Sequence, residues 1–347
     1  MFHHLGYPPM TKLLCLLFLF SFVTHTQAAA PAWVPVTTEL LKTEKTGFGG
    51  LCGVVVDHQT GDVWANLSDR GMFLSTDQGQ TWKRVSETQP KGRTETPGCW
   101  LIDPTGKTNR QVTALVYGDP ISVSSDRAAT WIMMGGKSGH IDWCAVDWTD
   151  PELRFVLALK HEAGGLLLAS GDSGKSFTEV GKGYGSGWVF DPQTAVVAQA
   201  QSNEQPQPQL MRTTDGGKTF LPCGEFSPVG GNSAQALPKW HARTLYWLTE
   251  SGLIATSDQG KTWKKIGEVK DAQYGPIFGQ TAKHMFVLTK AGPVESTDGG
   301  VTWSAPLAPP SDMQGLGGLS WLEYDPQHDT LYLMKMGSEL YRLSRGK

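Results

Sequence analysis

Three acidic residues are the strongest candidates for catalysis in this sequence: Asp119, Asp142 and Glu162. Two carboxyl groups on either side of a glycosidic bond can act as acid and base, or as acid and nucleophile. The three residues are far apart along the chain, so the fold must bring them together. They are the carboxylates to test first for catalysis.

Aromatic, cationic and imidazole side chains near these acids in the sequence could bind a ligand. The candidate ligand-binding residues are Asp69, Arg70, Arg93, His140, Trp143, Lys160, His161, Tyr184 and Trp188. His140, Asp142 and His161 could also form a metal site, but they lack a tight ligand spacing, so neither a metal nor a cofactor is predicted. The alternative for each position is an ordinary polar loop residue, or a tryptophan that packs between structural units.

An internal repeat indicates which elements position these side chains. One eight-residue pattern occurs six times, at 75–82, 124–131, 170–177, 213–220, 256–263 and 296–303. The third residue is always an aspartate, which can accept hydrogen bonds from nearby backbone N–H groups and hold a tight turn. These aspartates are Asp77, Asp126, Asp172, Asp215, Asp258 and Asp298. The fifth residue is glycine, which takes positive φ readily, except at Ala128, where we expect a distorted turn.

The spacing of the repeat indicates the architecture. Successive aspartates lie 40 to 49 residues apart, which is the length of one propeller blade rather than of a solenoid repeat. Within each repeat, short apolar runs with alternation predict four strands. Residues 31–347 have room for about seven such units. The predicted fold is therefore all-β, a single seven-bladed β-propeller of four-stranded antiparallel blades.

The two ends of the chain are predicted to complete one blade together. Residues 318–343 supply three strands without a fourth, and residues 33–36 align with 82–85, where a fourth strand begins in the first repeat. The N-terminal strand should therefore pair with the last sheet and close the ring, which removes open sheet edges. Deletion of residues 31–38 is expected to destabilise the fold strongly.

The pattern S-x-D-x-G-x-T-W resembles the Asp box, the BNR repeat of sialidase-like propellers. The resemblance covers nearly all of residues 31–347, and the chain is also similar to photosystem II assembly factors and to xyloglucanase propellers. It implies that the six aspartates are structural and lie on the outer rim of one face. It also implies that ligands bind on the opposite face, which is built by the loops leading into first strands and those joining second to third strands.

The resemblance does not extend to a known catalytic set. Sialidases need three arginines, a Tyr–Glu pair, an acidic Asp and an Arg-Ile-Pro motif. This sequence lacks Arg-Ile-Pro and has only Arg70 and Arg93 in suitable loops, so sialidase activity is not expected. Xyloglucanases of this type have two propellers in tandem, whereas this chain has room for one. The assembly factors are binding scaffolds, but their arginine-rich patch has no counterpart here.

Two functions therefore stay open. The preferred one is an exported, non-catalytic binding scaffold that holds a protein or glycan ligand on the face opposite the Asp boxes. The alternative is a glycan-active enzyme, a glycoside hydrolase or a lyase, that uses carboxylates at the mouth of the central channel.

The N-terminus and the composition bear on location and partners. Lys12 precedes an apolar stretch at 13–23, and three alanines follow at 28–30. This order is typical of a secretory signal peptide, here residues 1–30, with Met1 or Met10 as its start. We expect a secreted or periplasmic monomer with no membrane span. The net charge is −3 and no long basic run is present, so a nucleic-acid partner is not expected.

Four cysteines follow the signal segment: Cys52, Cys99, Cys144 and Cys223. They do not have the close spacing of a zinc site. Cys52 and Cys99 occupy similar places in neighbouring repeats and could form a disulfide in an oxidising compartment. Buried free thiols are the alternative.

Overall fold

A computed structural model describes residues 1–3, 6, 32–47, 49–85, 90–95, 97–135, 138–200, 208–228, 237–313, 315–317 and 319–346. Pro31–Lys347 form one compact unit, and the description below concerns that unit. The predicted signal peptide, apart from residues 1–3 and 6, lies outside the described residues. In the part of the chain that the structure describes, no helix has the length and apolar character needed to cross a membrane.

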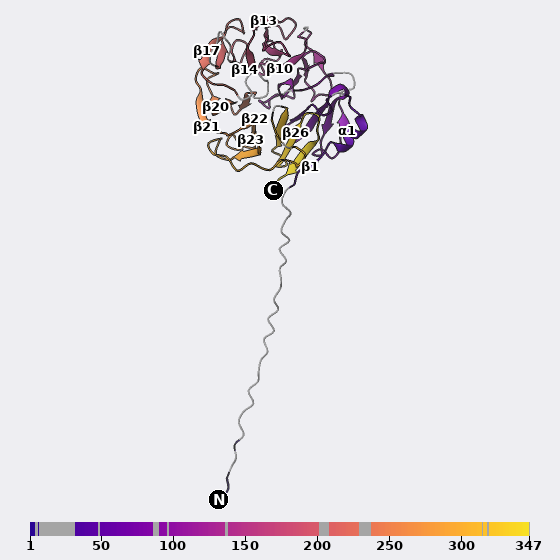
Figure 1. Ribbon diagram of the computed structural model, residues 1–347, viewed down its shortest axis with the longest axis vertical. Coiled ribbons are helices and arrows are strands. Elements are labelled where there is room, and N and C mark those ends of the chain that lie inside the picture. The colour runs from indigo at the N-terminus through magenta and orange to yellow at the C-terminus, as the bar shows by residue number, and fades with distance from the viewer. Residues whose placement is uncertain are drawn as a thin grey trace. The chain divides into compact units, whose positions relative to one another are not determined.

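Seven antiparallel sheets follow one another around a ring (Figure 1). Blade 1 consists of β2 (Gly53–Val56), β3 (Val63–Leu67), β4 (Gly71–Ser75) and β5 (Lys83–Arg84). Blade 2 consists of β6 (Trp100–Ile102), β7 (Gln111–Thr113), β8 (Ser122–Ser124) and β9 (Ile132–Met133). Blade 3 consists of β10 (Ile141–Val146), β11 (Val156–Lys160), β12 (Leu167–Ser170) and β13 (Thr178–Gly181). Blade 4 consists of β14 (Tyr184–Val189), β15 (Ala195–Gln199), β16 (Gln209–Thr213) and β17 (Leu221–Gly224).

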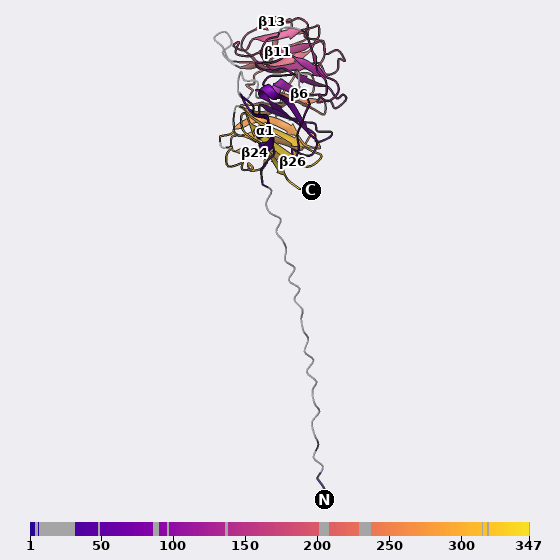
Figure 2. The ribbon, with the colours of Figure 1, turned by 90° about the vertical axis from the view of Figure 1, so that its right-hand side faces the viewer.

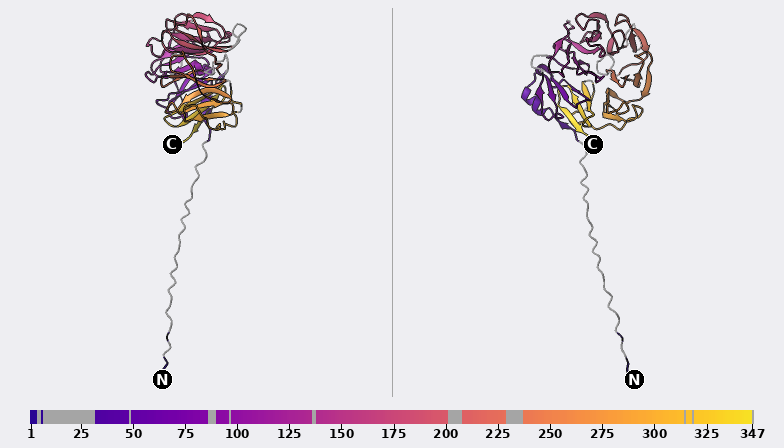
Figure 3. Two further views of the ribbon diagram at one scale, coloured as in Figure 1. Left: turned by 90° about the vertical axis from the view of Figure 1, so that its left-hand side faces the viewer. Right: turned by 180° about the vertical axis from the view of Figure 1, so that it is seen from behind.

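The remaining blades complete the ring, which is seen edge-on in Figure 2 and from behind in Figure 3. Blade 5 consists of β18 (Lys239–His241), β19 (Thr244–Thr249), β20 (Gly252–Thr256) and β21 (Lys264–Gly267). Blade 6 contains β22 (Ala272–Phe278), β23 (Met285–Thr289) and β24 (Gly292–Ser296). Blade 7 contains β25 (Ser320–Asp325), β26 (Thr330–Lys335), β27 (Leu340–Ser344) and β1 (Val34–Pro35). The first strands of blades 6, 7, 1 and 2 contact one another in turn, including β25 with β2 across the closure. The predicted seven-bladed all-β propeller is confirmed.

Blade 6 departs from the four-stranded pattern. Its sheet has three strands, and residues 304–307 run beside β24 without forming a regular strand. The backbone N–H groups of Ser304 and Leu307 donate to the carbonyls of Glu295 and Pro293, both at 2.8 Å. This segment therefore covers the edge of β24 with two hydrogen bonds, and Pro306 within it and Pro309 after it remove further donors.

The N-terminal strand completes blade 7, as predicted. In the β1–β27 pair, Val34 lies opposite Arg342 and Pro35 opposite Tyr341. The N–H of Val36 extends the pairing by donating to the carbonyl of Leu340 at 2.8 Å. The chain ends are thus joined by an antiparallel ladder like those within the other blades, and β27 is not left as an open edge.

A short helix and two single 3-10 turns were not anticipated from the sequence. Helix α1 (Thr38–Glu44) follows β1 and lies at the periphery of the ring (Figures 1 and 2). It ends at Lys45 in the left-handed region, with φ of 47°. The 3-10 turns are η1 (Ser68–Arg70) and η2 (Pro97–Cys99). The Arg70 side chain of η1 donates to the carbonyls of Glu44 and Lys45, and so attaches the end of α1 to blade 1.

All six Asp boxes share one hydrogen-bond pattern. In the copy at 170–177, the Asp172 carboxylate accepts the Ser170 hydroxyl at 2.7 Å, and the backbone N–H and hydroxyl of Ser176 at 2.9 and 2.6 Å. The N–H of Gly174 donates to the Ser170 hydroxyl at 2.9 Å. Hydrogen bonds from Ser176 hold the pKa of Asp172 at about 2, because they stabilise the charged form. Each aspartate therefore holds its own turn in place through these hydrogen bonds.

The box at Ala128 is not distorted, contrary to the prediction. Ala128 takes φ of 66°, and its N–H donates to the Ser124 hydroxyl at 2.8 Å, as glycine does in the other copies. Its methyl group is fully buried in a cluster with Trp64, Met72 and Trp100 between blades 1 and 2. Packing of that methyl compensates for the cost of a left-handed backbone at a residue other than glycine.

Candidate functional site

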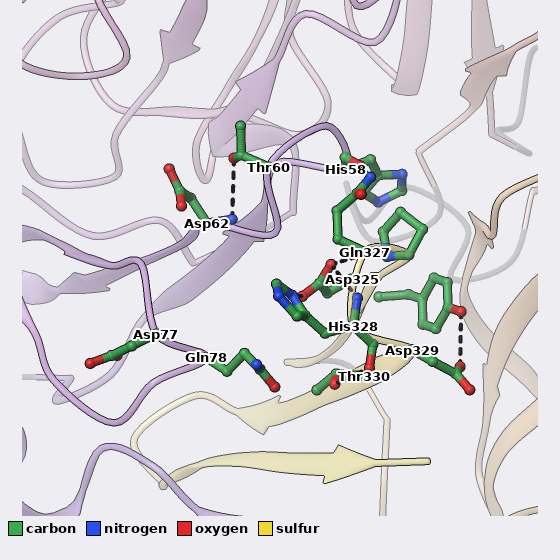
Figure 4. Close-up of polar contacts among 12 residues, drawn as sticks. His58, Thr60, Asp62, Asp77, Gln78, Asp325, Gln327, His328, Asp329 and Thr330 are labelled. Atoms are coloured by element: carbon green, nitrogen blue, oxygen red, sulfur yellow. Dashed lines mark hydrogen bonds and ion pairs between the residues drawn. The ribbon is translucent and has the colours of Figure 1, made fainter. Parts of the chain in front are cut away.

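The two faces of the ring use their polar groups differently. Because successive strands of a blade run in opposite directions, the Asp-box turns share one face with the turns that join first to second strands. On that face, amide side chains link neighbouring blades: Gln59 donates to the carbonyl of Gly106 at 2.8 Å, and Gln327 to that of His58 at 2.9 Å (Figure 4). Gln280 likewise donates to the carbonyl of Pro326 at 2.9 Å.

Ionic contacts reinforce this face. The guanidinium of Arg127, within the second Asp box, pairs with Asp57 at 3.3 Å and with Asp62, both on blade 1. In blade 7 the Asp325 carboxylate accepts the backbone N–H of Gln327 and contacts the His328 ring at 2.6 Å (Figure 4). These groups hold turns and join blades, which agrees with a structural role for the Asp-box face.

The opposite face carries a group of residues that we call the Tyr117 cluster. It spans blades 2 and 3, and its members come from the segments leading into the first strands and from the loops joining second to third strands. The cluster consists of Arg93, Tyr117, His140, Asp142, His161 and Glu162. Five of these six residues were candidates from the sequence, and Tyr117 is the one that joins them.

Tyr117 lies at the centre of the cluster and is 49% exposed. Its ring packs edge-on against His140 and His161, with centroids 4.5 and 5.2 Å apart. The Arg93 guanidinium lies 4.8 Å from the ring centroid, within cation–π range. The phenol donates to Glu162 at 3.4 Å. The aromatic face of Tyr117 is thus held in place by its neighbours and still reaches solvent.

His161 connects two of the three candidate catalytic carboxylates. Its Nδ1 lies 2.6 Å from Asp142 Oδ1, and its Nε2 lies 3.6 Å from Glu162 Oε1. Burial raises the pKa of Asp142, and the hydrogen bond with His161 opposes that rise. The Glu162 side chain is 74% exposed. Asp142 therefore orients the imidazole, whereas Glu162 is available to a partner from solvent.

The backbone of the cluster is rigid and partly strained. Tyr117 and Glu162 both have φ of 52°, in the left-handed region that residues other than glycine seldom adopt. The N–H of His161 donates to the carbonyl of His140 at 2.9 Å, and Arg93 exchanges two backbone hydrogen bonds with Val116. Such conformations persist where the surroundings fix them, and they occur often at binding sites.

Asp119 serves a different purpose from Asp142 and Glu162. Its carboxylate accepts the N–H of Lys91 at 2.7 Å, and its own N–H donates to the Lys91 carbonyl at 2.8 Å. It therefore pins the segment that leads into blade 2. A hollow of about 560 Å³ lies beside it, lined by Asp69, Lys91, Arg93 and Tyr117. This hollow continues from the Tyr117 cluster and gives that face a concave region.

The other predicted binding residues are divided between surface and core. Lys160 is exposed on the same face, and Asp69 lines the hollow. Arg70 is committed to the end of α1, as described above. Trp143 is fully buried in the core, and Tyr184 is nearly so, so these two rings pack between strands and do not present a surface to a ligand. Trp188 lies on the central channel.

Comparisons with known proteins agree with this architecture. Residues 73–84 match the family model described as BNR/Asp-box repeat. The chain carries a BNR/Asp-box repeat. The predicted resemblance of this Asp-box propeller to BNR propellers is confirmed, and a search of curated proteins finds no match.

Several solved structures resemble this Asp-box propeller at low sequence identity. The extracellular domain of BT4673 from B. thetaiotaomicron has a TM-score of 0.50 and 11% identity over 85% of this chain and 38% of that one. YCF48 bound to D1 peptide has a TM-score of 0.49 and 13% identity over 91% and 97%. The GH74 xyloglucanase from Xanthomonas campestris has a TM-score of 0.36 and 14% identity over 84% and 62%. This chain thus spans less than two thirds of the xyloglucanase, and likeness at this identity concerns the fold alone.

Sequence reasoning missed the polar groups of the central channel. The channel contains a cavity of about 200 Å³, lined by first strands of several blades. Lys239, Glu323 and His58 face it together with Tyr274 and several indoles. A signal is present in the sequence of blade 7, where Glu323 interrupts the otherwise largely apolar run Trp321–Tyr324 of the first strand, and Lys239 begins the first strand of blade 5. In the described part of the chain, no group of three or more metal-ligating side chains is assembled.

Proposed function

We propose that this chain is an exported, non-catalytic binding scaffold that holds a protein or glycan ligand on the face opposite the Asp boxes. The observation that carries the proposal is the half-exposed ring of Tyr117, fixed between Arg93, His140 and His161 beside a hollow. Tyrosine and arginine are among the residue types enriched at the energetic centre of binding surfaces. A ring that is already immobilised loses little side-chain entropy when a ligand covers it.

The use of polar groups on the two faces supports the same choice of surface. On the Asp-box face, the described amides and guanidinium contact other parts of the ring. On the opposite face, His140, Lys160 and Glu162 remain largely exposed. A ligand there meets an aromatic ring flanked by groups of both charges, which can bind peptide or sugar hydroxyl groups.

A binding role fits the carboxylates better than catalysis does. The Asp142 carboxylate is hydrogen-bonded to His161, and the Asp119 carboxylate accepts the backbone N–H of Lys91. A glycosidase requires two carboxyl groups that face the same scissile bond. Only Asp142 and Glu162 come together, and His161 stands between them. The enzyme alternative therefore depends on that pair alone.

The test uses Tyr117→Ala in the full-length protein, with arrays of peptides and of polysaccharide fragments as ligands. Loss of a central aromatic contact should weaken binding of any ligand found by about 2 kcal/mol, or about 30-fold. The matched control is Val301→Ala, an exposed residue in an Asp-box turn on the other face. Its binding should equal that of the unmodified protein. Ligand binding that Tyr117→Ala leaves unchanged would place the site elsewhere.

Turnover distinguishes the scaffold from the enzyme. The same protein is incubated with polysaccharides and aryl glycosides, and products are measured. No release of product is expected. If product forms, and if formation stops in Asp142→Ala and Glu162→Ala while both variants remain folded, the non-catalytic proposal is wrong and the glycan-active alternative is correct.

A further inference from the structure

The central channel contains a second concave site that is separate from the Tyr117 cluster. Its cavity of about 200 Å³ is lined by residues of β2, β6, β14, β18, β22 and β25. His58, Lys239 and His241 are each partly exposed, so the cavity communicates with solvent. An engineered cavity of roughly 150 Å³ is large enough for benzene, so this one has room for a single substituted ring.

Three side chains from three blades form a hydrogen-bonded chain along one wall. The Lys239 ammonium donates to the Tyr274 phenol oxygen at 2.8 Å, and that phenol donates to Glu323 Oε1 at 3.3 Å. Tyr274 is fully buried, and Glu323 is 8% exposed. Burial, together with the neighbouring Glu323 carboxylate, raises the pKa of Tyr274, so the phenol keeps its proton and serves as the link.

This chain leaves hydrogen-bonding capacity unused toward the cavity. An ammonium has three N–H donors and a carboxylate has two acceptor oxygens. Among the described residues, Lys239 has one hydrogen-bond partner and Glu323 Oε2 has none. Charged groups out of water are costly unless their hydrogen bonds are satisfied. A ligand or water in the cavity can complete them.

The charges that face the cavity nearly balance. Burial, then the charge of Lys239, lowers the pKa of His58 to about 4, so its ring is neutral at pH 7. Burial also lowers the pKa of His241. Burial raises the pKa of Glu323 to about 7, with Lys239 opposing the rise. The Glu323 carboxylate would repel a strongly anionic ligand, and the Lys239 ammonium would repel a cationic one. An uncharged ligand with both donors and acceptors avoids either conflict.

Much of the remaining lining is aromatic. Trp188 and Trp240 stack on each other with an interplanar angle of 10° and centroids 6.1 Å apart, and both line the cavity with Trp100 and Trp148. Indole faces offer flat apolar surface to a ring, while the polar wall offers directed hydrogen bonds. We infer that the channel binds a small uncharged polyol of the size of one sugar ring, with its hydroxyl groups on Lys239 and Glu323.

The experiment titrates full-length protein with glucose, galactose and myo-inositol, and with glucuronate and glucosamine as charged analogues. Indole fluorescence reports occupancy because four tryptophans line the cavity, and calorimetry gives the dissociation constant. At least one neutral ring should saturate below about 10 mM, and both charged analogues should bind more weakly. Lys239→Met and Glu323→Gln keep side-chain volume and remove the charges, and each should weaken binding about 10- to 100-fold.

Two comparisons make the result decisive. Trp188→Phe keeps an aromatic wall of smaller area, so it should weaken polyol binding less than Lys239→Met or Glu323→Gln does. If those two variants do not fold, Trp188→Phe provides the test of binding in the channel. Tyr117→Ala should leave polyol binding unchanged, because the Tyr117 cluster lies outside the channel; this also separates failure of this site from failure of the scaffold proposal. The inference is overturned if no neutral ring binds, if the charged analogues bind equally well, or if binding survives in Lys239→Met and Glu323→Gln.

Discussion

Removal of one hydroxyl group tests whether the N-terminal strand holds the ring closed. Thr37 follows β1 and is fully buried. Its hydroxyl donates to Glu339 Oε2 at 2.8 Å and accepts the backbone N–H of Leu340 at 2.9 Å. Thr37→Val keeps the side-chain shape and removes both hydrogen bonds. Both partners belong to blade 7, so the change acts on the closure alone.

The expected loss of stability follows from what remains unpaired. The N–H of Leu340 would be buried without a partner, which costs about 1–3 kcal/mol. Loss of the hydrogen bond to the Glu339 carboxylate costs about 1.5–3 kcal/mol. Because Glu339 is partly exposed and can bind water instead, we expect a total near 3 kcal/mol. Deletion of residues 31–38 also removes the β1 ladder and the hydrogen bond from the Trp82 indole to the Val36 carbonyl. The free energy of unfolding that this deletion removes should therefore approach the whole stability of a typical domain.

Urea unfolding followed by circular dichroism measures both effects. The control is Thr43→Val, an exposed position in α1, where a change within about 0.5 kcal/mol is expected. If Thr37→Val falls within the range of that control, or if the deletion variant keeps the melting temperature of the full chain, the N-terminal strand does not close the ring.

Three other measurements address the turns, the thiols and the channel. Gly260→Ala should lower the free energy of unfolding in urea by about 2–4 kcal/mol, because Gly260 has φ of 78° and an added Cβ would lie 2.4 Å from the Val196 side chain. Ala128→Gly should change it by only about 1 kcal/mol. An equal loss in both variants would contradict the inference that packing against the neighbouring blade decides whether a methyl group is tolerated. Burial raises the pKa of the Cys223 thiol, yet among the described residues it is the least buried of the four free cysteines. Ellman's reagent should therefore modify it first in folded protein, and a melting temperature that falls on addition of dithiothreitol would indicate a disulfide instead. Burial raises the pKa of Glu323 from 4.5 to about 7. Its contribution to the free energy of unfolding is therefore fully present below pH 4.5 and falls by about 3 kcal/mol as pH rises to 7. Glu323→Gln should lack this part of the dependence of stability on pH, and identical dependence in both proteins would refute the raised pKa of Glu323.

The repeat predicted blade number and turn chemistry well because both are local. The hydrogen bonds that hold the turn around each Asp-box aspartate lie within one segment of eight residues, so the sequence contains the donors and acceptors of that turn. Ala128 shows where local reasoning ends. Whether a methyl group is tolerated at positive φ depends on the neighbouring blade, which supplies Trp64 and Met72 there and Val196 at Gly260.

The candidate site was predicted in part for the same reason. Assignment of loops to one face followed from strand order, and it placed His140, Asp142, His161 and Glu162 in one neighbourhood. The burial of Trp143 was not predictable, because alternate residues of a first strand face the channel or the adjacent blade, and β10 has a register shift between Ile141 and Trp143. Lys239 and Glu323 come from different blades. Only the closed ring brings them to the same cavity.

The two faces also differ in what a substitution there can change. Where a side chain donates to the backbone of the next blade, as Gln327 does to His58, its loss acts on the ring as a whole, since each blade is held by its neighbours. Where side chains contact one another at the surface, as Tyr117 and His140 do, the strands beneath them keep their own ladder hydrogen bonds when a ring is removed. The Tyr117 face can therefore vary its chemistry without loss of the scaffold, and this is the property that a binding surface on a repeat architecture requires.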